Sequence, residues 1–242
     1  ESGVEKLLKA TIDAAVQAQV VKPAEFERVI VDTTVQEKAI AHPVDSRLLE
    51  IARSKIVQAA KRSGITLKQS YAKEGKELRR KAGGYAHAKQ FRRMRKTVKR
   101  QRTILGIVLR EIKRKLATTE LGCSASLQPL NTLLERAQRI HKQQPKDKNK
   151  LYALHAPEVK CIGKGKARKP YEFGVKASIA ITHKNGLMIG AKTFPGNPYD
   201  GHILHKQLTQ TQILLENAGS TPKQFIVDLG FRGVDTDNPD VN

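Results

Sequence analysis

Tryptophan is absent from this 242-residue chain, and aromatic residues make up only 5% of it. Cysteine is scarce as well: Cys123 and Cys161 form no CxxC pair, which argues against a disulfide framework or a cysteine-based zinc site. No apolar run is long enough for a membrane helix, and no signal peptide is recognisable. These shortages argue against small disulfide-rich secreted domains and membrane proteins. We therefore expect a protein of the reducing cytoplasm with no membrane partner.

Acidic residues are also few: 45 Lys and Arg stand against 23 Asp and Glu, giving a formal net charge of +22 and a pI near 10.1. Such an excess repels itself unless a polyanionic partner neutralises it, and nucleic acid is the obvious candidate. A membrane surface fits less well, because no basic amphipathic anchor is visible. The 39% hydrophobic content is enough for a core, and the length allows one large domain or two small ones. The chain opens at Glu1 inside a helical pattern, so we expect a fragment.

Hydrophobic periodicity divides the first part of the chain into three elements. Apolar residues at helical spacing predict a helix over 4–21, which Pro23 ends. The apolar run 26–32 predicts a strand that ends in Asp32. Apolar spacing then predicts a second helix that begins at Asp45 or Ser46 and stops near Gly64.

A basic segment follows. Between Lys73 and Arg102 there are thirteen Lys or Arg and two Glu, about half of the positive excess of the chain. Its centre, "KQFRRMRKTVKRQR", holds eight bases and no acid, with Phe91, Met94 and Val98 as a thin apolar stripe that continues to Leu116. This helix presents either a solvated charged face or, as we prefer because no acid pairs its bases, a surface for DNA phosphates. The candidate phosphate-binding residues are Arg92, Arg93, Arg95, Lys96, Lys99 and Arg100.

The last third of the chain changes to a β-rich pattern, after a further helix predicted over 128–143. Residues 171–183 and 187–194 predict a hairpin around the turn "KNG". A helix is predicted over 202–217. The apolar run 224–233 predicts another short strand, in which Asp228 follows the apolar residues as Asp32 does in the strand predicted over 26–32.

Asp32 and Asp228 are therefore a matched pair of strand-terminal acids. If their strands are neighbours in one sheet, the two carboxylates lie about 5 Å apart in the strand-to-strand direction. Carboxylates that close repel each other, and a divalent cation such as Mg²⁺, which prefers oxygen ligands, removes the repulsion. Metal ions held in this way support phosphoryl displacement. The alternative is that each Asp only caps its strand.

Four blocks of sequence carry a resemblance beyond this pattern: "VDTTVQEKAIAHPVDSRLL", "YALHAPEVKCIGKGKARKPYEFGVKASIA", "GNPYDGH" and "VDLGFRG". Together, and in this order, they resemble bacterial insertion-sequence transposases of the DDE class, within insertion-sequence family five. The resemblance implies an α/β fold: a ribonuclease-H-like mixed sheet with a large basic helical insertion between the first strand and the hairpin. The catalytic core would comprise 23–43 and 151–242, the insertion 44–150, and residues 1–22 the end of an N-terminal helical region.

The same resemblance implies a function: metal-dependent DNA strand cleavage and strand transfer at insertion-sequence ends. Asp32 and Asp228 match the first two acids and would hold Mg²⁺ or Mn²⁺. The partner would be double-stranded DNA. The protein would be bacterial and nucleoid-associated, and it could form a homo-oligomer on DNA. Two departures stand out. Leu229 replaces an expected arginine, and the third acid, a later glutamate, is missing before Asn242. The acids of the tail "VDTDNPDVN" are expected to be solvated, so the core is expected to be incomplete at its C-terminus.

Alternatives remain open at this point. Asp200 and His202 match a family block and would either position substrate or cap the helix that follows. The loop "GKGKARK" lacks P-loop spacing and is expected to be flexible. The missing acid and Leu229 favour a second hypothesis, a truncated, inactive transposase remnant that only binds DNA. A third hypothesis, a basic RNA-binding protein, fits the four blocks poorly.

Overall fold

The computed structural model describes residues 3–118, 127–163, 165 and 167–232. The chain forms two compact units: a sheet unit, residues 1–38 and 160–242, and a helical unit, residues 39–159. The helical unit is thus inserted into the sequence of the sheet unit. In the described ranges, no helix combines the length and apolar character needed to span a membrane.

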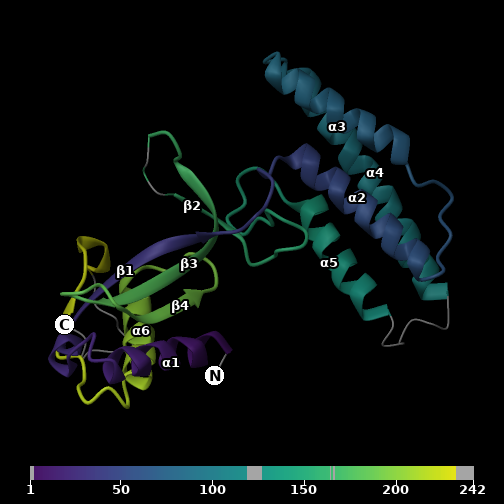
Figure 1. The fold of residues 1–242 in the computed structure, drawn as a ribbon. Helices are drawn as coiled ribbons and strands as arrows, with labels where there is room; N and C mark the ends of the chain where they lie inside the picture. The colour runs from purple at the N-terminus through teal and green to yellow at the C-terminus, as the bar shows by residue number, and fades with distance from the viewer. Residues whose placement is uncertain (1–2, 119–126, 164, 166, 233–242) are drawn as a thin grey trace. The chain divides into compact units, whose positions relative to one another are not determined.

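The sheet unit is built from two stretches of chain (Figure 1). The first stretch gives α1 (Gly3–Gln17), the short helix η1 (Pro23–Glu27) and β1 (Arg28–Glu37). The second gives β2 (Lys160–Gly163), β3 (Tyr171–Thr182), β4 (Met188–Phe194), α6 (Gly201–Leu214), β5 (Gln224–Ile226) and η4 (Leu229–Phe231).

The sheet is mixed, and β3 is its central strand. β1 runs antiparallel along one side of β3, while β2 and β4 pair antiparallel with successive parts of its other side. β5 runs parallel to β1 at the outer edge. The predicted hairpin is present: Gly186, with φ of 64°, donates its N–H to the Thr182 carbonyl in the β3–β4 turn.

One face of the sheet is covered by α1 and α6, which lie on the same side of it (Figure 1). Val29 and Val31 of β1 point to this face and pack with Ile12 of α1 and Leu208 of α6. Because side chains alternate along a strand, Ile30 and Asp32 point to the opposite face. Val29 and Val31 therefore belong to the core of the sheet unit, whereas Asp32 faces away from that core.

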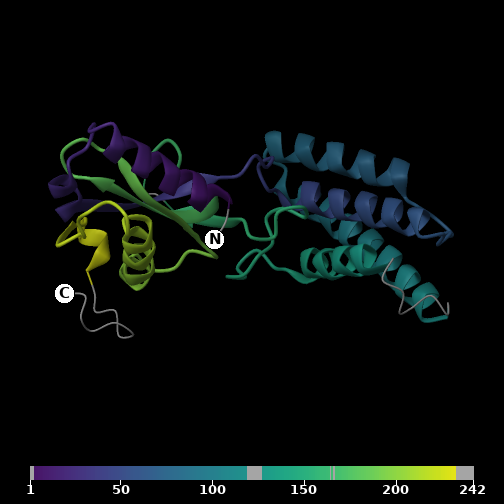
Figure 2. The same cartoon turned by 60° about the horizontal axis from the view of Figure 1, so that its bottom comes forward.

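The helical unit comprises α2 (Asp45–Arg62), α3 (Ala72–His87), α4 (Phe91–Thr118) and α5 (Gln128–Lys142), which run alongside one another in Figure 2. Apolar residues at helical spacing meet in one core, among them Leu49, Ile56, Leu105, Ile112 and Ile140. α2 packs against each of the other three helices. Hydrophobic burial from these four amphipathic helices is the main force that holds the unit together.

A buried ion pair adds a polar contact beneath α3. Arg53 binds Glu50 through two hydrogen bonds, Nε–Oε2 at 2.8 Å and NH2–Oε1 at 2.6 Å, and both side chains are almost fully buried. The remaining nitrogen of Arg53 donates to the Ser70 carbonyl, just before α3. Gly75 of α3 lies against this pair, and a Cβ at that position would overlap the Glu50 carboxylate.

Several boundaries differ from those expected, and two elements were not expected. The strand predicted over 224–233 ends at Ile226, so Asp228 lies beyond it, at the start of η4. β1 does not end at Asp32 but continues to Glu37, because its pairing with β3 extends from Val29 to Glu37. The basic helix does not begin at residue 89, since α4 starts at Phe91 and runs on to Thr118. The helix α3 and the short strand β2 had no counterpart in the periodicity of the sequence.

Candidate functional site

Asp32 and Asp228 follow the same end of the paired segment of β1 and β5. The two strands are parallel, with Arg28 opposite Gln224 and Ile30 opposite Ile226. β5 ends at Ile226, so Asp228 lies two residues beyond the last paired residue and precedes η4, while Asp32 follows Ile30 by two residues in β1. The expectation that these strands are neighbours is thereby confirmed.

Side-chain contacts reinforce that register. Arg28 Nε donates to Gln224 Oε1 at 2.8 Å, from positions that are also paired along the backbone. Immediately before each strand, the Lys223 N–H donates to the Glu27 carbonyl at 3.0 Å, and the two side chains form an ion pair at 2.7 Å. A one-residue slip would break these contacts.

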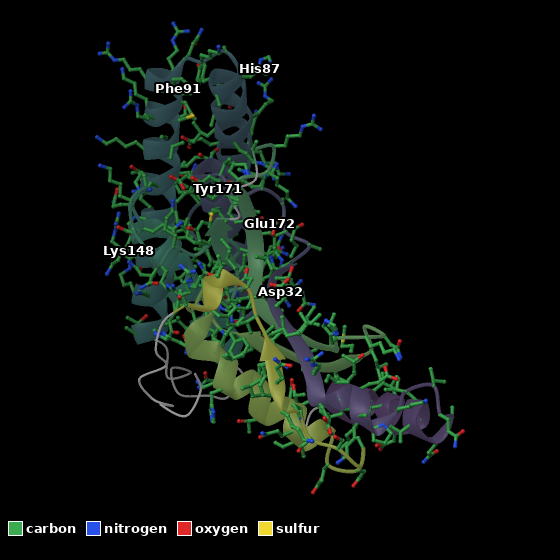
Figure 3. All side chains as sticks on the ribbon, turned by 90° about the vertical axis from the view of Figure 1, so that its left-hand side faces the viewer. Asp32, His87, Phe91, Lys148, Tyr171 and Glu172 are labelled. Carbon is green, nitrogen blue, oxygen red and sulfur yellow. The ribbon has the colours of Figure 1, made fainter. Side chains whose placement is uncertain are left out.

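Both acids are exposed and make short local hydrogen bonds. Asp32, labelled on β1 in Figure 3, accepts from the N–H of Thr33 at 2.7 Å. Asp228 accepts from the N–H of Gly230 at 2.8 Å and precedes the short helix η4. Each bond engages Oδ1, and among the described residues neither carboxylate has an ion-pair partner. Both carboxylates therefore retain acceptor capacity toward solvent.

Asp200 also lies near Asp228. A Cβ built on Gly230 would stand 2.9 Å from Asp228 Oδ1 and 3.4 Å from Asp200 Oδ2, so the two acids flank the same glycine. Asp200 is held by Lys176 of β3, whose Nζ lies 2.7 Å from Oδ1 and also donates to the Pro198 carbonyl at 2.6 Å. Gly230 has no side chain, so space remains between the two carboxylates. A larger residue would fill that space.

The helix-capping alternative for Asp200 is wrong. Asp200 immediately precedes α6, but its side chain makes no hydrogen bond to the helix N-terminus. The carboxylate binds Lys176 instead, because the ammonium group offers a stronger, charge-assisted bond than a backbone amide. His202 is not part of this group: it is exposed on α6 and packs edge-to-face on Tyr199, with ring centroids 5.4 Å apart.

A metal ion would find suitable but few ligands here. Asp32 and Asp228 present hard carboxylate oxygens from matched positions, the donor chemistry that Mg²⁺ and Mn²⁺ take. Within the described ranges, no three His, Cys, Asp or Glu side chains gather closely enough to form a complete site. The donor set fits one cation whose remaining positions are filled by water or substrate oxygens.

The second candidate surface is the N-terminal half of α4, in the helical unit. All six predicted phosphate-binding residues are exposed there. Arg92, Arg95, Lys96 and Lys99 recur at helical spacing and share one face of α4, which we call the basic face. Beside it lies an apolar cleft of about 720 Å³, which is lined by α3, α4, the start of α2 and residues 144–145 and to which Arg95, Lys99 and Arg102 contribute.

Arg100 differs from the others. Its Nε lies 2.7 Å from Glu74 Oε1 of α3, and this partner raises the pKa of the Arg100 guanidinium. The expectation that no acid pairs the bases of this segment is therefore wrong for Arg100. The acid comes from the neighbouring helix, and the sequence could have shown it only if α3 had been recognised and docked on α4. Arg93 points to the same flank and donates to Gln90.

Comparison with known proteins bears directly on the acids. Residues 137–236 match the family model of the transposase DDE domain. This DDE match includes Asp200 and Asp228 and begins after Asp32. An uncharacterized protein, ORF8 in the nfe locus of Rhizobium meliloti, is 53% identical over 89 residues. The aligned stretch covers 37% of this chain and 43% of that relative, so the chain spans less than half of its length. No solved structure matches the chain significantly.

Proposed function

We propose that the chain is part of a DDE transposase of the insertion-sequence family-five kind, which cleaves DNA strands at element ends and transfers them. The carrying observation is that Asp32 and Asp228 each lie two residues past the last paired residues of the parallel strands β1 and β5. The DDE match over residues 137–236 supports it. The strand order β4–β3–β1–β5, a hairpin joined by β1 to a parallel fourth strand, supports a ribonuclease-H-like core with residues 44–150 as its basic insertion.

In this proposal Asp32 and Asp228 hold Mg²⁺ or Mn²⁺. A bound cation would polarise the scissile phosphate and lower the pKa of a bound water. Asp32 lies within β1 and Asp228 two residues after β5, its paired neighbour, so the sheet limits how far the two acids can separate when substrate enters. Lys176 holds Asp200 beside Asp228 and keeps this third carboxylate in a fixed place. In this proposal Asp200 helps to position substrate next to the metal site, and His202 is a candidate for contact with substrate.

The basic face of α4 binds the DNA backbone. Arg92, Arg95, Lys96 and Lys99 are exposed and free of acidic partners among the described residues, so each can neutralise a phosphate. Phosphate contacts fix the position of DNA without reading its sequence. This surface therefore supplies affinity for any duplex, and the recognition of element ends lies with other contacts.

A matched set of variants tests the two acids. Mn²⁺ binding to the 242-residue chain, followed by electron paramagnetic resonance, should be weak and should be lost in Asp32→Asn and Asp228→Asn. Asp13→Asn, which changes an acid of α1 outside this pair, is the control and should bind Mn²⁺ as the parent does. Binding that survives in both site variants would refute the metal site, whereas loss of circular dichroism would support the strand-cap alternative.

The second candidate function is DNA binding without cleavage, which the lack of a three-acid cluster among the described residues favours. We expect the 242-residue chain to bind DNA and not to cut it with Mg²⁺, because a two-metal reaction needs more carboxylate ligands than Asp32 and Asp228 supply. Nicking of element-end DNA by this chain would show that a carboxylate already present completes the site.

The basic face is tested through its dependence on salt. Removing one cation that neutralises a phosphate should reduce the slope of log K against log salt by about 0.9. Arg92→Gln, Lys96→Gln and Lys99→Gln should each show this change on duplexes of any sequence. Arg100→Gln should change the slope less, because Glu74 already holds that guanidinium. Equal slopes in all four variants and the parent would place the DNA elsewhere.

A further inference from the structure

Phe91 is a feature of the helical unit that phosphate binding does not use. The apolar stripe of the sequence predicts that it packs inward, yet the structure leaves it 53% exposed at the first position of α4. Over the described residues 39–118 and 127–159, the large hydrophobic side chains left exposed are Val44 and Phe91. In a chain with so few aromatic residues, an exposed phenyl ring is a feature to explain.

Phe91 sits at the tip of the α3–α4 hairpin, and Figure 3 shows it beside His87 at the end of the two helices. The connection between the helices is short and hydrogen-bonded. The Gln90 N–H donates to the Tyr85 carbonyl at 2.8 Å, and Lys89 takes a left-handed conformation with φ of 55° to make the turn. Arg95 Nε donates back to the Phe91 carbonyl at 3.3 Å. The backbone of Phe91 is therefore held on two helices and not on a loose loop.

Cations surround the ring. Lys89, Arg92 and Arg93 line a shallow surface hollow together with Phe91 and Gln90. No Asp or Glu occurs in the sequence between Glu77 and Glu111, so the tip has no local acid to neutralise it. Apolar anchors of protein–protein interfaces lie in the uncharged centre of a patch. A single ring enclosed by cations matches a different ligand, one with flat apolar faces joined to anions.

We propose that Phe91 stacks on a nucleobase that is unpaired in the bound DNA, while Lys89, Arg92 and Arg93 contact the phosphates on either side. Aromatic rings stack on the faces of bases with little regard for sequence, and apolar side chains enter duplexes where base steps are opened. The inference rests on the proposed DNA binding by α4 and deepens it. The tip of the hairpin would add selectivity for distorted DNA to the general affinity of the basic face.

The absence of tryptophan gives a direct assay. Phe91→Trp makes residue 91 the sole tryptophan, whose emission should be quenched when the full chain binds a duplex with one unpaired base. The matched control is Tyr171→Trp, at another exposed aromatic position, on β3 in the sheet unit. Its emission should not distinguish that duplex from a fully paired one.

Affinity gives the second readout. Phe91→Ala should weaken binding to the duplex with an unpaired base by about 5- to 150-fold, the range that stacking contributes. Binding to the fully paired duplex and the salt slope should stay as in the parent, and Phe91→Tyr should restore the affinity for the unpaired base.

Three outcomes would overturn the inference. An equal effect of Phe91→Ala on both duplexes, or no effect on either, would show that the ring does not read an opened base. Loss of self-association in sedimentation without a change in base binding would assign the ring to a protein contact. Failure of the folded parent to bind either duplex would instead overturn the proposed DNA binding, and the inference with it.

Discussion

Replacing Arg53 with methionine should destabilise the helical unit severely. The guanidinium makes three hydrogen bonds, two to Glu50 at 2.6 and 2.8 Å and one to the Ser70 carbonyl at 2.7 Å. The side chain of Arg53 is 4% exposed and that of Glu50 is 7% exposed. Removing one partner leaves the other charge buried without compensation, which costs about 3–5 kcal/mol. That is a large share of the stability of an ordinary domain, roughly 5–15 kcal/mol.

The assay is urea denaturation followed by far-ultraviolet circular dichroism, which reports mainly on the helical unit. The double variant Glu50→Leu with Arg53→Met removes both charges, so it should recover most of the stability. Lys81→Met breaks the exposed pair between Lys81 and Glu77 on α3 and should leave the midpoint nearly unchanged.

Two results would refute this reasoning. A destabilisation below about 1 kcal/mol in Arg53→Met would mean that the pair is worth no more than a surface ion pair, as when water reaches it. A double variant as unstable as the single one would assign the destabilisation to packing around the stem of Arg53 and not to the unpaired carboxylate.

Three further predictions concern other sites. Gly174→Ala should unfold the sheet unit, because the added Cβ overlaps a β1 backbone oxygen; limited proteolysis of this variant should show rapid cleavage where the parent resists. Lys176→Met should release Asp200, so that Mn²⁺ binding changes while the helical unit keeps its melting temperature. The pKa of His141 is lowered below its ordinary 6.5 by burial and then by Arg102, so stability present above pH 6.5 should fall as the pH drops below it. His141→Gln should remove that part of the pH dependence of the melting temperature, and an unchanged profile would contradict the assignment.

Elements with strong local signals could be predicted from the sequence. The β3–β4 hairpin follows from alternation around "KNG", and α2 and α5 follow from apolar spacing. α3 could not be predicted in this way because its buried positions are small: Gly75 and Ala82 make no apolar pattern. The end of β1 could not be predicted because pairing with β3, far along the chain, extends the strand beyond Asp32.

The candidate site, like the fold, could be predicted only in part from the sequence. Matching strands identified Asp32 and Asp228, since each acid follows an apolar run that a reader can find without the fold. The partner of Asp200 could not be found in this way, because Lys176 is 24 residues away and reaches it only through the sheet. Phe91 was misplaced for a related reason: periodicity shows which face of a helix is apolar but not where the neighbouring helix stops.

The insertion of the helical unit between β1 and the rest of the sheet has a consequence for biosynthesis. β1 leaves the ribosome early, yet its partners β3 and β5 follow only after residues 39–159 have emerged. Domains fold as units during synthesis, so the helical unit can finish while β1 still has unpaired edges. Its completion then shortens the effective loop that β1 must close. We expect nascent chains halted before residue 171 to expose β1 to proteases and chaperones, although the helical unit within them is already folded.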